Sequence, residues 1–145
     1  MLLEALATVF AGLFAGASIY INLVEHPARL ECGTEIATKQ FAPSYHRASW
    51  MQASLAASGF MTALGAAFQR HAESLLVAGL LLGAVIPFTL LVILPTNRRL
   101  LSPGLDRSSA EAAKLLARWG RLHAVRSVLG VAAFGILVWH LARAD

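Results

Sequence analysis

The sequence is poor in cysteine and in charged residues. Its 145 residues include a single cysteine, Cys32, which excludes an internal disulfide and a metal site built from several cysteines. Only 14% of the residues are charged, whereas soluble domains average about 25%. This shortage argues against an ordinary soluble domain and makes the places where charge is missing informative.

Charge is absent from four long runs, residues 5–24, 48–69, 74–97 and 127–142. A helix needs about 20 mostly apolar residues to cross a bilayer. The first three runs reach that length, and the fourth reaches it with its flank. We therefore predict an all-α fold, an integral membrane four-helix bundle in up-down-up-down order with short loops. It forms a single domain, residues 1–145, with spans at about 2–26, 45–69, 74–94 and 119–142.

Local signals refine this prediction. A cleaved signal peptide is the alternative for the first run, but the residues before it contain no Lys or Arg and the run is longer than an h-region. Residues 27–43 are expected to form a connection with a short interfacial helix. The last helix is expected to begin near Ala110, after a serine cap, and Pro87 is expected to kink the third span.

Basic residues gather on one side of the predicted bundle. Nine Lys and Arg fall on the first and third connections with their helix flanks, two (Arg70 and Arg143) fall on the other side, and Arg126 is the twelfth. Because basic loops stay in the cytoplasm, we predict a multi-pass protein of the cell (inner) membrane with both termini outside. The net charge of +4 then reflects contact with the lipid bilayer, and no nucleic-acid partner is expected.

Each predicted span also has polar side chains at its cytoplasmic end, at spacings of three, four or seven residues that share a helix face. They are Asn22, Glu25, His26 and Arg29 in the first span, Tyr45, Ser49 and Gln52 in the second, Thr96 and Asn97 in the third, and Trp119, His123 and Arg126 in the fourth. We expect a polar pocket that opens toward the cytoplasm.

Arg126 most needs a partner in this pocket, because an ionised group in hydrocarbon costs about 2.5–3.5 kcal/mol. Glu25 is its predicted partner, as an acid at matching depth on a neighbouring helix. Other arginines near the membrane surface are interpreted as interfacial anchors. These are Arg29, Arg47, Arg98 and Arg99.

A metal site is an alternative use of the same residues. Glu25, His26 and His46, together with His123, would supply carboxylate and imidazole ligands suited to iron, copper or zinc. Histidines on facing helices would also suit haem. No helix carries two histidines four residues apart, so the sequence leaves the cofactor open between a metal (iron or copper), haem and none.

Four stretches, in order, give the chain a likeness to a known family: GLFAGASIYINLVEHPA, PSYHRA, IPFTLLVILPTNRRLL and WGRLHAVRSVLGVAAF. With them the chain resembles the anthrone oxygenase-like family of small four-span membrane proteins, largely a domain of unknown function. Fungal members of that family oxidise anthrones to anthraquinones with O₂. The resemblance implies an O₂-dependent oxidoreductase acting on a small aromatic or quinone-like substrate.

The resemblance covers the EHP, YHR, PTN and WGRLHAVR motifs and so implies roles for their residues. As a hypothesis, His123 is the general base, while Arg126 and Asn97 stabilise an enolate oxygen. Glu25 would orient a catalytic group or bind a metal. Tyr45 completes the predicted catalytic set. The predicted substrate-binding residues are Asn22, Gln52, Trp119 and Thr96.

Two non-enzymatic interpretations stay open. One is a binding or accessory subunit that holds a metal, haem or a partner protein in the membrane. The other is a transporter, which would need polar residues through the whole membrane, whereas this sequence has them in one half. A homo-oligomer or a membrane partner also stays open.

Overall fold

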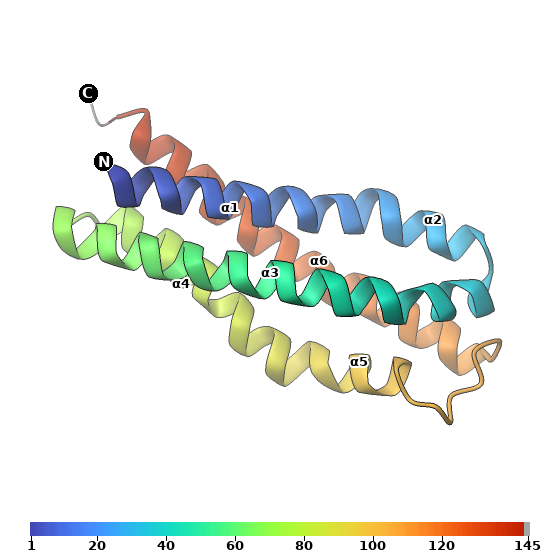
Figure 1. The fold of residues 1–145 in the computed structure, drawn as a ribbon. Helices are drawn as coiled ribbons and strands as arrows, with labels where there is room; N and C mark the ends of the chain where they lie inside the picture. The colour runs from blue at the N-terminus through green and yellow to red at the C-terminus, as the bar shows by residue number, and fades with distance from the viewer. Residues whose placement is uncertain (144–145) are drawn as a thin grey trace.

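The computed structural model describes residues 1–143, and residues 144–145 of the predicted domain lie outside the described residues. Four helical rods run side by side (Figure 1). The first joins α1 (Leu2–Tyr20), η1 (Ile21–Glu25) and α2 (His26–Glu31), and the second is α3 (Thr34–Arg70). The third joins α4 (Glu73–Phe88), η2 (Thr89–Ile93) and α5 (Leu94–Leu100), and the fourth is α6 (Ala110–Leu141).

The connection expected at residues 27–43 is instead almost entirely helical. The first rod continues to Glu31, and α3 begins at Thr34 and carries Pro43 within it. Gly33 makes the turn between them at a φ of +89°, a conformation that costs glycine little because it has no Cβ. The two rods are therefore joined by a tight turn, and both extend well past the predicted spans.

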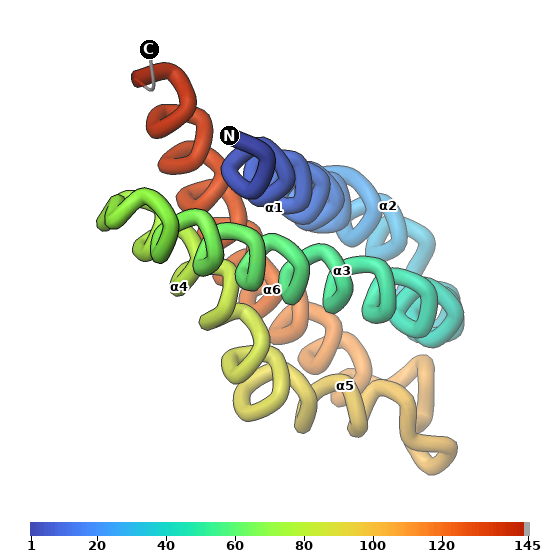
Figure 2. The backbone as a smooth tube through the Cα atoms, turned by 60° about the vertical axis from the view of Figure 1, so that its left-hand side comes forward, coloured from blue at the N-terminus to red at the C-terminus, as the bar shows by residue number. Residues whose placement is uncertain are grey.

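The rods form the predicted four-helix bundle. The first rod packs against α3 and α6, and α4 packs against the same two helices, so the four close into a ring (Figure 2). The half of the bundle near the two termini has an apolar core built from Ala7, Phe14, Ala63, Leu82 and Leu137. Among residues 1–143 every regular element is helical, which confirms the all-α prediction.

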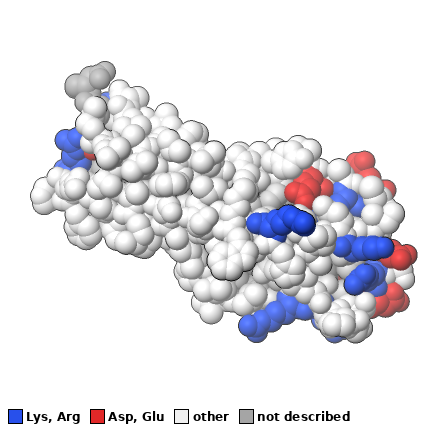
Figure 3. Space-filling model, in the orientation of Figure 1, with Lys and Arg blue, Asp and Glu red and all other residues white. Residues whose placement is uncertain are grey.

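Three of the rods, residues 2–31, 73–100 and 110–141, are long and apolar enough to cross a membrane. The chain is thus a membrane protein. α3 is not one of these three, although it packs between α1 and α4 along the bundle. Charged side chains gather at the end formed by α2, α5 and the start of α3, whereas the middle of the visible face carries none (Figure 3).

Two turns of π-helix interrupt the rods, and each lies directly before an X-Pro pair. The backbone N–H of His26 donates to the Ile21 carbonyl, and that of Leu94 donates to the Thr89 carbonyl, five residues back in each case. Pro27 and Pro95 follow, and a proline ring clashes with the carbonyl four residues earlier in a regular α-helix. The wider turn relieves that clash. The third rod also bends where α4 passes into η2, next to Pro87 (Figures 1 and 2), in agreement with the predicted kink.

Candidate functional site

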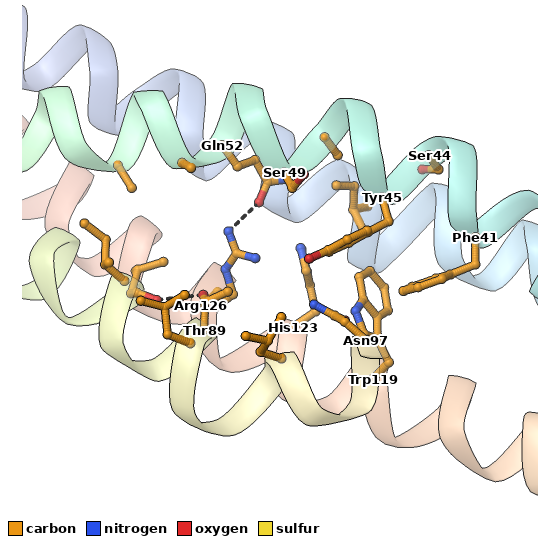
Figure 4. Close-up of a pocket in the computed structure, with 18 of the residues that line it drawn as sticks. Phe41, Ser44, Tyr45, Ser49, Gln52, Thr89, Asn97, Trp119, His123 and Arg126 are labelled. Atoms are coloured by element: carbon orange, nitrogen blue, oxygen red, sulfur yellow. Dashed lines mark hydrogen bonds between the residues drawn. The ribbon is translucent and has the colours of Figure 1, made fainter. Parts of the chain in front are cut away.

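A cavity of about 230 Å³ lies within the bundle, in the half away from the termini. Pockets for drug-sized ligands measure roughly 300–1,000 Å³, so this one suits a small molecule. Aliphatic side chains of α3, α4 and η2 form much of the wall (Figure 4). The polar and aromatic lining consists of Arg29, Phe41, Ser44, Tyr45, Ser49, Gln52, Thr89, Asn97, Trp119, His123 and Arg126.

His123 of α6 is held by Asn22 of η1, and the contact defines its tautomer. The Asn22 amide nitrogen donates to the Gly120 carbonyl at 3.0 Å, so its oxygen faces α6. That oxygen lies 2.7 Å from His123 Nδ1 and accepts from the Ser127 hydroxyl at 2.6 Å. Because an amide oxygen only accepts, Nδ1 carries the proton. In the neutral ring the other nitrogen, Nε2, then keeps a free lone pair, and His123 lines the cavity.

Arg126 lies about one turn further along α6, and its partners are an amide and an aromatic ring. Its Nη2 donates to Gln52 Oε1 at 2.8 Å (Figure 4), and its guanidinium carbon lies 5.7 Å from the centre of the Phe14 ring. Gly130 makes room for Phe14, since a Cβ there would lie 2.7 Å from that ring. None of the ion pairs found among residues 1–143 includes Arg126. The site therefore holds an uncompensated positive charge.

The predicted pairing of Glu25 with Arg126 is wrong. Glu25 Oε1 instead accepts from Arg29, from the Ser44 hydroxyl and from Gln40. The π-turn gives the physical reason, because its extra residue rotates the helix beyond it. Asn22 and His26 face α6, whereas Glu25 and Arg29 turn toward α3.

Arg29 is not the interfacial anchor that the sequence suggested. It is only 6% exposed and lines the cavity. Its guanidinium carbon lies 5.9 Å from the Phe41 ring centre and 5.8 Å from the Trp119 ring centre, in addition to its ion pair with Glu25. Arginine over an aromatic face is a favourable cation–π contact, so this group is bound firmly at one end of the cavity.

Aromatic rings form the wall next to Arg29. Trp119 stacks on His123 at 4.8 Å between ring centres and 29° between planes, and it meets Phe41 edge-on at 5.2 Å. Tyr45 lies nearly parallel to Phe41 at 5.7 Å. Flat walls of this kind favour a planar aromatic ligand, because aromatic pairs prefer offset-stacked and edge-to-face contacts at these distances.

Two amides in the cavity wall keep polar atoms without partners. Gln52 and Asn97 are almost fully buried, and Gln52 Nε2 and Asn97 Oδ1 make no hydrogen bond within the described part of the chain. The Nε atoms of Arg126 and Arg29 are in the same situation. Leaving such groups unpaired costs about 1–3 kcal/mol each. The cavity therefore offers N–H donors and an acceptor to an oxygen-bearing ligand.

The structure gathers some of the predicted site residues and separates others. Six line the cavity, namely Tyr45, Gln52, Asn97, Trp119, His123 and Arg126. Asn22 lies behind His123 and bonds it, and Thr96 is buried in α5 but does not line the cavity. Sequence reasoning missed Phe41 and Thr89. Phe41 is four residues before Tyr45 and shares its helix face, a signal hidden by the expected connection at 27–43.

The residues considered for a metal lie apart. His26 packs against Trp119 and Gly120, His46 is exposed beside Tyr45, and Glu25 bonds Arg29 and α3. Within residues 1–143 no group of three or more His, Cys, Asp or Glu side chains is arranged to hold a metal ion.

Comparison with known proteins identifies the family. The model of the anthrone oxygenase family matches residues 41–136, which include most of the cavity wall. The chain is 29% identical over 138 residues to an anthrone oxygenase of Claviceps purpurea (strain 20.1), covering 84% of this chain and 79% of the relative. It is 28% identical over 140 residues to the anthrone oxygenase tpcL of Aspergillus fumigatus, covering 86% and 84%.

A third relative, the anthrone oxygenase AgnL2 of Paecilomyces divaricatus, is 28% identical over 160 residues, with 94% of this chain and 96% of the relative covered. No solved structure matches the chain. The family model spans more than half of the sequence and the relatives span most of it. The resemblance found in the sequence is thereby confirmed, and the chain belongs to the anthrone oxygenase family.

Proposed function

We propose that this protein oxidises an anthrone-type aromatic ketone with O₂, in the cavity between its four helices. The observation that carries this proposal is His123, oriented by Asn22, beside an Arg126 that has no ion pair among residues 1–143. A base next to a cation in a mostly apolar cavity is suited to removing a proton from carbon and holding the resulting anion. Membership of the anthrone oxygenase family supplies the substrate class.

The first step is proton removal. The methylene C–H of an anthrone is acidic because its loss gives an aromatic phenolate. His123 Nε2 takes this proton, and Asn22 Oδ1 supports the charged ring through Nδ1–H. A positioned general base contributes about 10²–10⁴-fold to such a step. Tyr45 and Trp119 lie along the cavity wall and fix the plane of the substrate rings.

The negative charge that develops on the substrate oxygen is met by donors that lack partners. Arg126 Nε and Gln52 Nε2 are buried without hydrogen bonds, and Asn97 adds a third amide in the same wall. Donors already held in place cost no reorganisation when charge appears, and removing one such donor elsewhere costs about 2.7–4 kcal/mol. Arg126 supplies the positive counter-charge, and Glu25 does not neutralise it because Glu25 is paired with Arg29.

The carbanion then reacts with O₂ by passing one electron to it and recombining, which forms a C–O bond and a peroxide on the substrate. His123 returns its proton to the peroxide oxygen. Loss of the second C–H proton to His123 breaks the O–O bond, releases hydroxide and leaves the new carbonyl. The hydroxide takes that proton and leaves as water. One anthrone and one O₂ give one anthraquinone and one water, so O₂ is the only oxidant required.

The test is turnover by the detergent-purified protein with anthrone under air, following O₂ uptake and anthraquinone absorbance together. We expect equal amounts of O₂ consumed and quinone formed. His123→Ala should lower kcat by about 10²–10⁴-fold. The matched control is His140→Ala, because His140 bonds Ser74 at the opposite end of the bundle and should leave kcat unchanged.

Full activity of a folded His123→Ala protein would remove the base role. Iron and copper are measured in the same preparations. Stoichiometric metal that is lost together with activity in His123→Ala would replace the base role by a ligand role. A wild-type protein that binds anthrone without consuming O₂ would contradict the oxygenase function itself.

A further inference from the structure

The cavity has exposed wall residues on one side only. Ala53 of α3, Ile86 of α4 and Leu90 of η2 line the cavity and are also exposed on the surface, Leu90 by 57%. All three belong to the wall formed by α3 and the third rod, and that rod bends where α4 passes into η2 (Figure 2). We call this opening, bordered by Ala53, Ile86 and Leu90, the lateral window. All three of its side chains are apolar.

The end of the cavity toward the basic turns is covered by packed side chains. Phe41 and Trp119 form this end of the wall, and behind them Leu100, Leu105 and Leu116 are buried in one apolar cluster. Arg29 is buried here as well, fixed by Glu25 and by the two aromatic rings. A molecule arriving from water at this end would have to displace a packed core. The lateral window has no such obstruction.

The lateral window lies at the depth of the hydrocarbon. Leu90 precedes the Arg98–Arg99 pair by eight residues, which corresponds to about 12 Å along a helix. Ala53 follows Arg47 by six residues, or about 9 Å. Exposed arginines occupy the headgroup level, so both residues lie below it. Leu91, beside Leu90, is 76% exposed, as expected for a lipid-facing surface.

We infer that the cavity is entered sideways from the bilayer through the lateral window, and that its substrate is an apolar aromatic molecule dissolved in the membrane. A charged or heavily hydroxylated molecule would be desolvated at an apolar rim that offers it no hydrogen bond. A planar ketone with one or a few oxygens passes the rim and reaches the unpaired donors of Gln52 and Arg126 inside. The inference rests on the proposed function only for the identity of the substrate, since the route follows from the cavity.

The test measures binding separately from turnover. Trp119 lines the cavity, so Trp50→Phe and Trp139→Phe leave it as the single tryptophan; both replaced residues are exposed and lie outside the cavity. Quenching of its fluorescence by anthraquinone in lipid nanodiscs then reports entry without any reaction. Ala53→Phe and Ile86→Phe, singly and together, fill the lateral window. Ala84→Phe is the matched control, because Ala84 is exposed on α4 and does not line the cavity.

We expect the double window variant to lower both the rate of quenching and kcat/KM for anthrone by at least about tenfold, with Ala84→Phe unchanged. Folding is checked by circular dichroism and gel filtration in detergent. Unchanged quenching in folded window variants would overturn the inference. Equal quenching by the water-soluble anthraquinone-2-sulfonate would also overturn it, since that ion enters from water. Window-dependent quenching without turnover by the wild type would support the route and contradict the oxygenase function.

Discussion

At the scale of single residues, the site depends on how two polar side chains, Asn22 and Arg126, are held in place. Asn22 has one carbonyl partner, Gly120, which orients its amide and thereby the tautomer of His123. Arg126 has no acidic partner in the described part of the chain and is held by Gln52 and the Phe14 ring. A buried charge without a partner is costly, so its retention is best explained by a ligand that becomes anionic in the cavity.

Asn22→Ala tests the orientation of the base. Without the amide oxygen, His123 can adopt either tautomer or rotate, so fewer molecules present Nε2 with its lone pair. We expect kcat to fall by about 10–100-fold, the usual effect of losing a residue that orients a functional histidine, with KM little changed. Steady-state kinetics with anthrone measures this split.

Ser127→Ala is the comparison for Asn22→Ala. It removes one donor to the Asn22 oxygen and leaves the contact with His123 in place, so its effect on kcat should be several-fold smaller. Equal losses in the two variants would mean that Asn22 acts through packing rather than through the tautomer.

Much of the cavity wall could be predicted from the sequence at this scale. Tyr45, Gln52, Asn97 and His123 share a depth and point inward, and both properties follow from a period of 3.6 residues and the cost of polar groups in lipid. The partner of Glu25 was misread for a physical reason. A π-turn shifts the helical phase of every residue beyond it, and periodic patterns do not reveal the extra residue.

At the scale of elements, the two π-turns shape the cavity. η1 separates the face that carries Asn22 from the face that carries Arg29, and η2 contributes Thr89 and Leu90 to the cavity wall. Each precedes a proline whose ring a regular helix does not accommodate. These prolines therefore serve the site, at a cost in helix stability.

Pro27→Ala tests this role of η1. Alanine restores a backbone N–H and allows a regular turn, which would rotate Glu25 and Arg29 away from α3. We expect kcat/KM for anthrone to fall, while the free energy of unfolding stays equal or rises, by at most the ~3 kcal/mol that separates proline from alanine in a helix interior. Kinetics and thermal unfolding in detergent measure the two effects.

Pro43→Ala provides the matched control. Pro43 lies within α3, is exposed and does not line the cavity. It should gain stability in the same way without a loss of activity. If Pro27→Ala also kept full activity, the phase shift of η1 would not matter for the site.

Helix number could be predicted from run length, but helix extent could not. Residues 34–44 contain charges and a proline, which predicted a connection with only a short interfacial helix, yet they form the first turns of α3. Phe41 explains the difference, because it is fully buried against Trp119. Tertiary packing of this kind outweighs local helix propensity, and a local sequence pattern does not reveal such packing.

At the scale of the whole molecule, one half of the bundle is a packed apolar support and the other half contains the chemistry. Phe14 and Leu82 belong to the support, and the cavity begins above them at Ala56 and Val85. The basic residues gather at the end beyond the cavity. We propose that this end faces the cytoplasm, because basic flanks are retained there, and orientation then decides from which leaflet the lateral window is reached.

The single cysteine allows a direct measurement of orientation. Cys32 is exposed at the end of α2, so a membrane-impermeant maleimide should label it in inside-out vesicles and not in right-side-out vesicles. Cys32→Ser combined with Glu73→Cys moves the thiol to the exposed turn at the opposite end and should reverse the pattern. The reverse result for both proteins would place the basic end outside and the lateral window in the outer leaflet. The route through the lateral window would survive that result, because it depends on depth and exposure and not on which side is the cytoplasm.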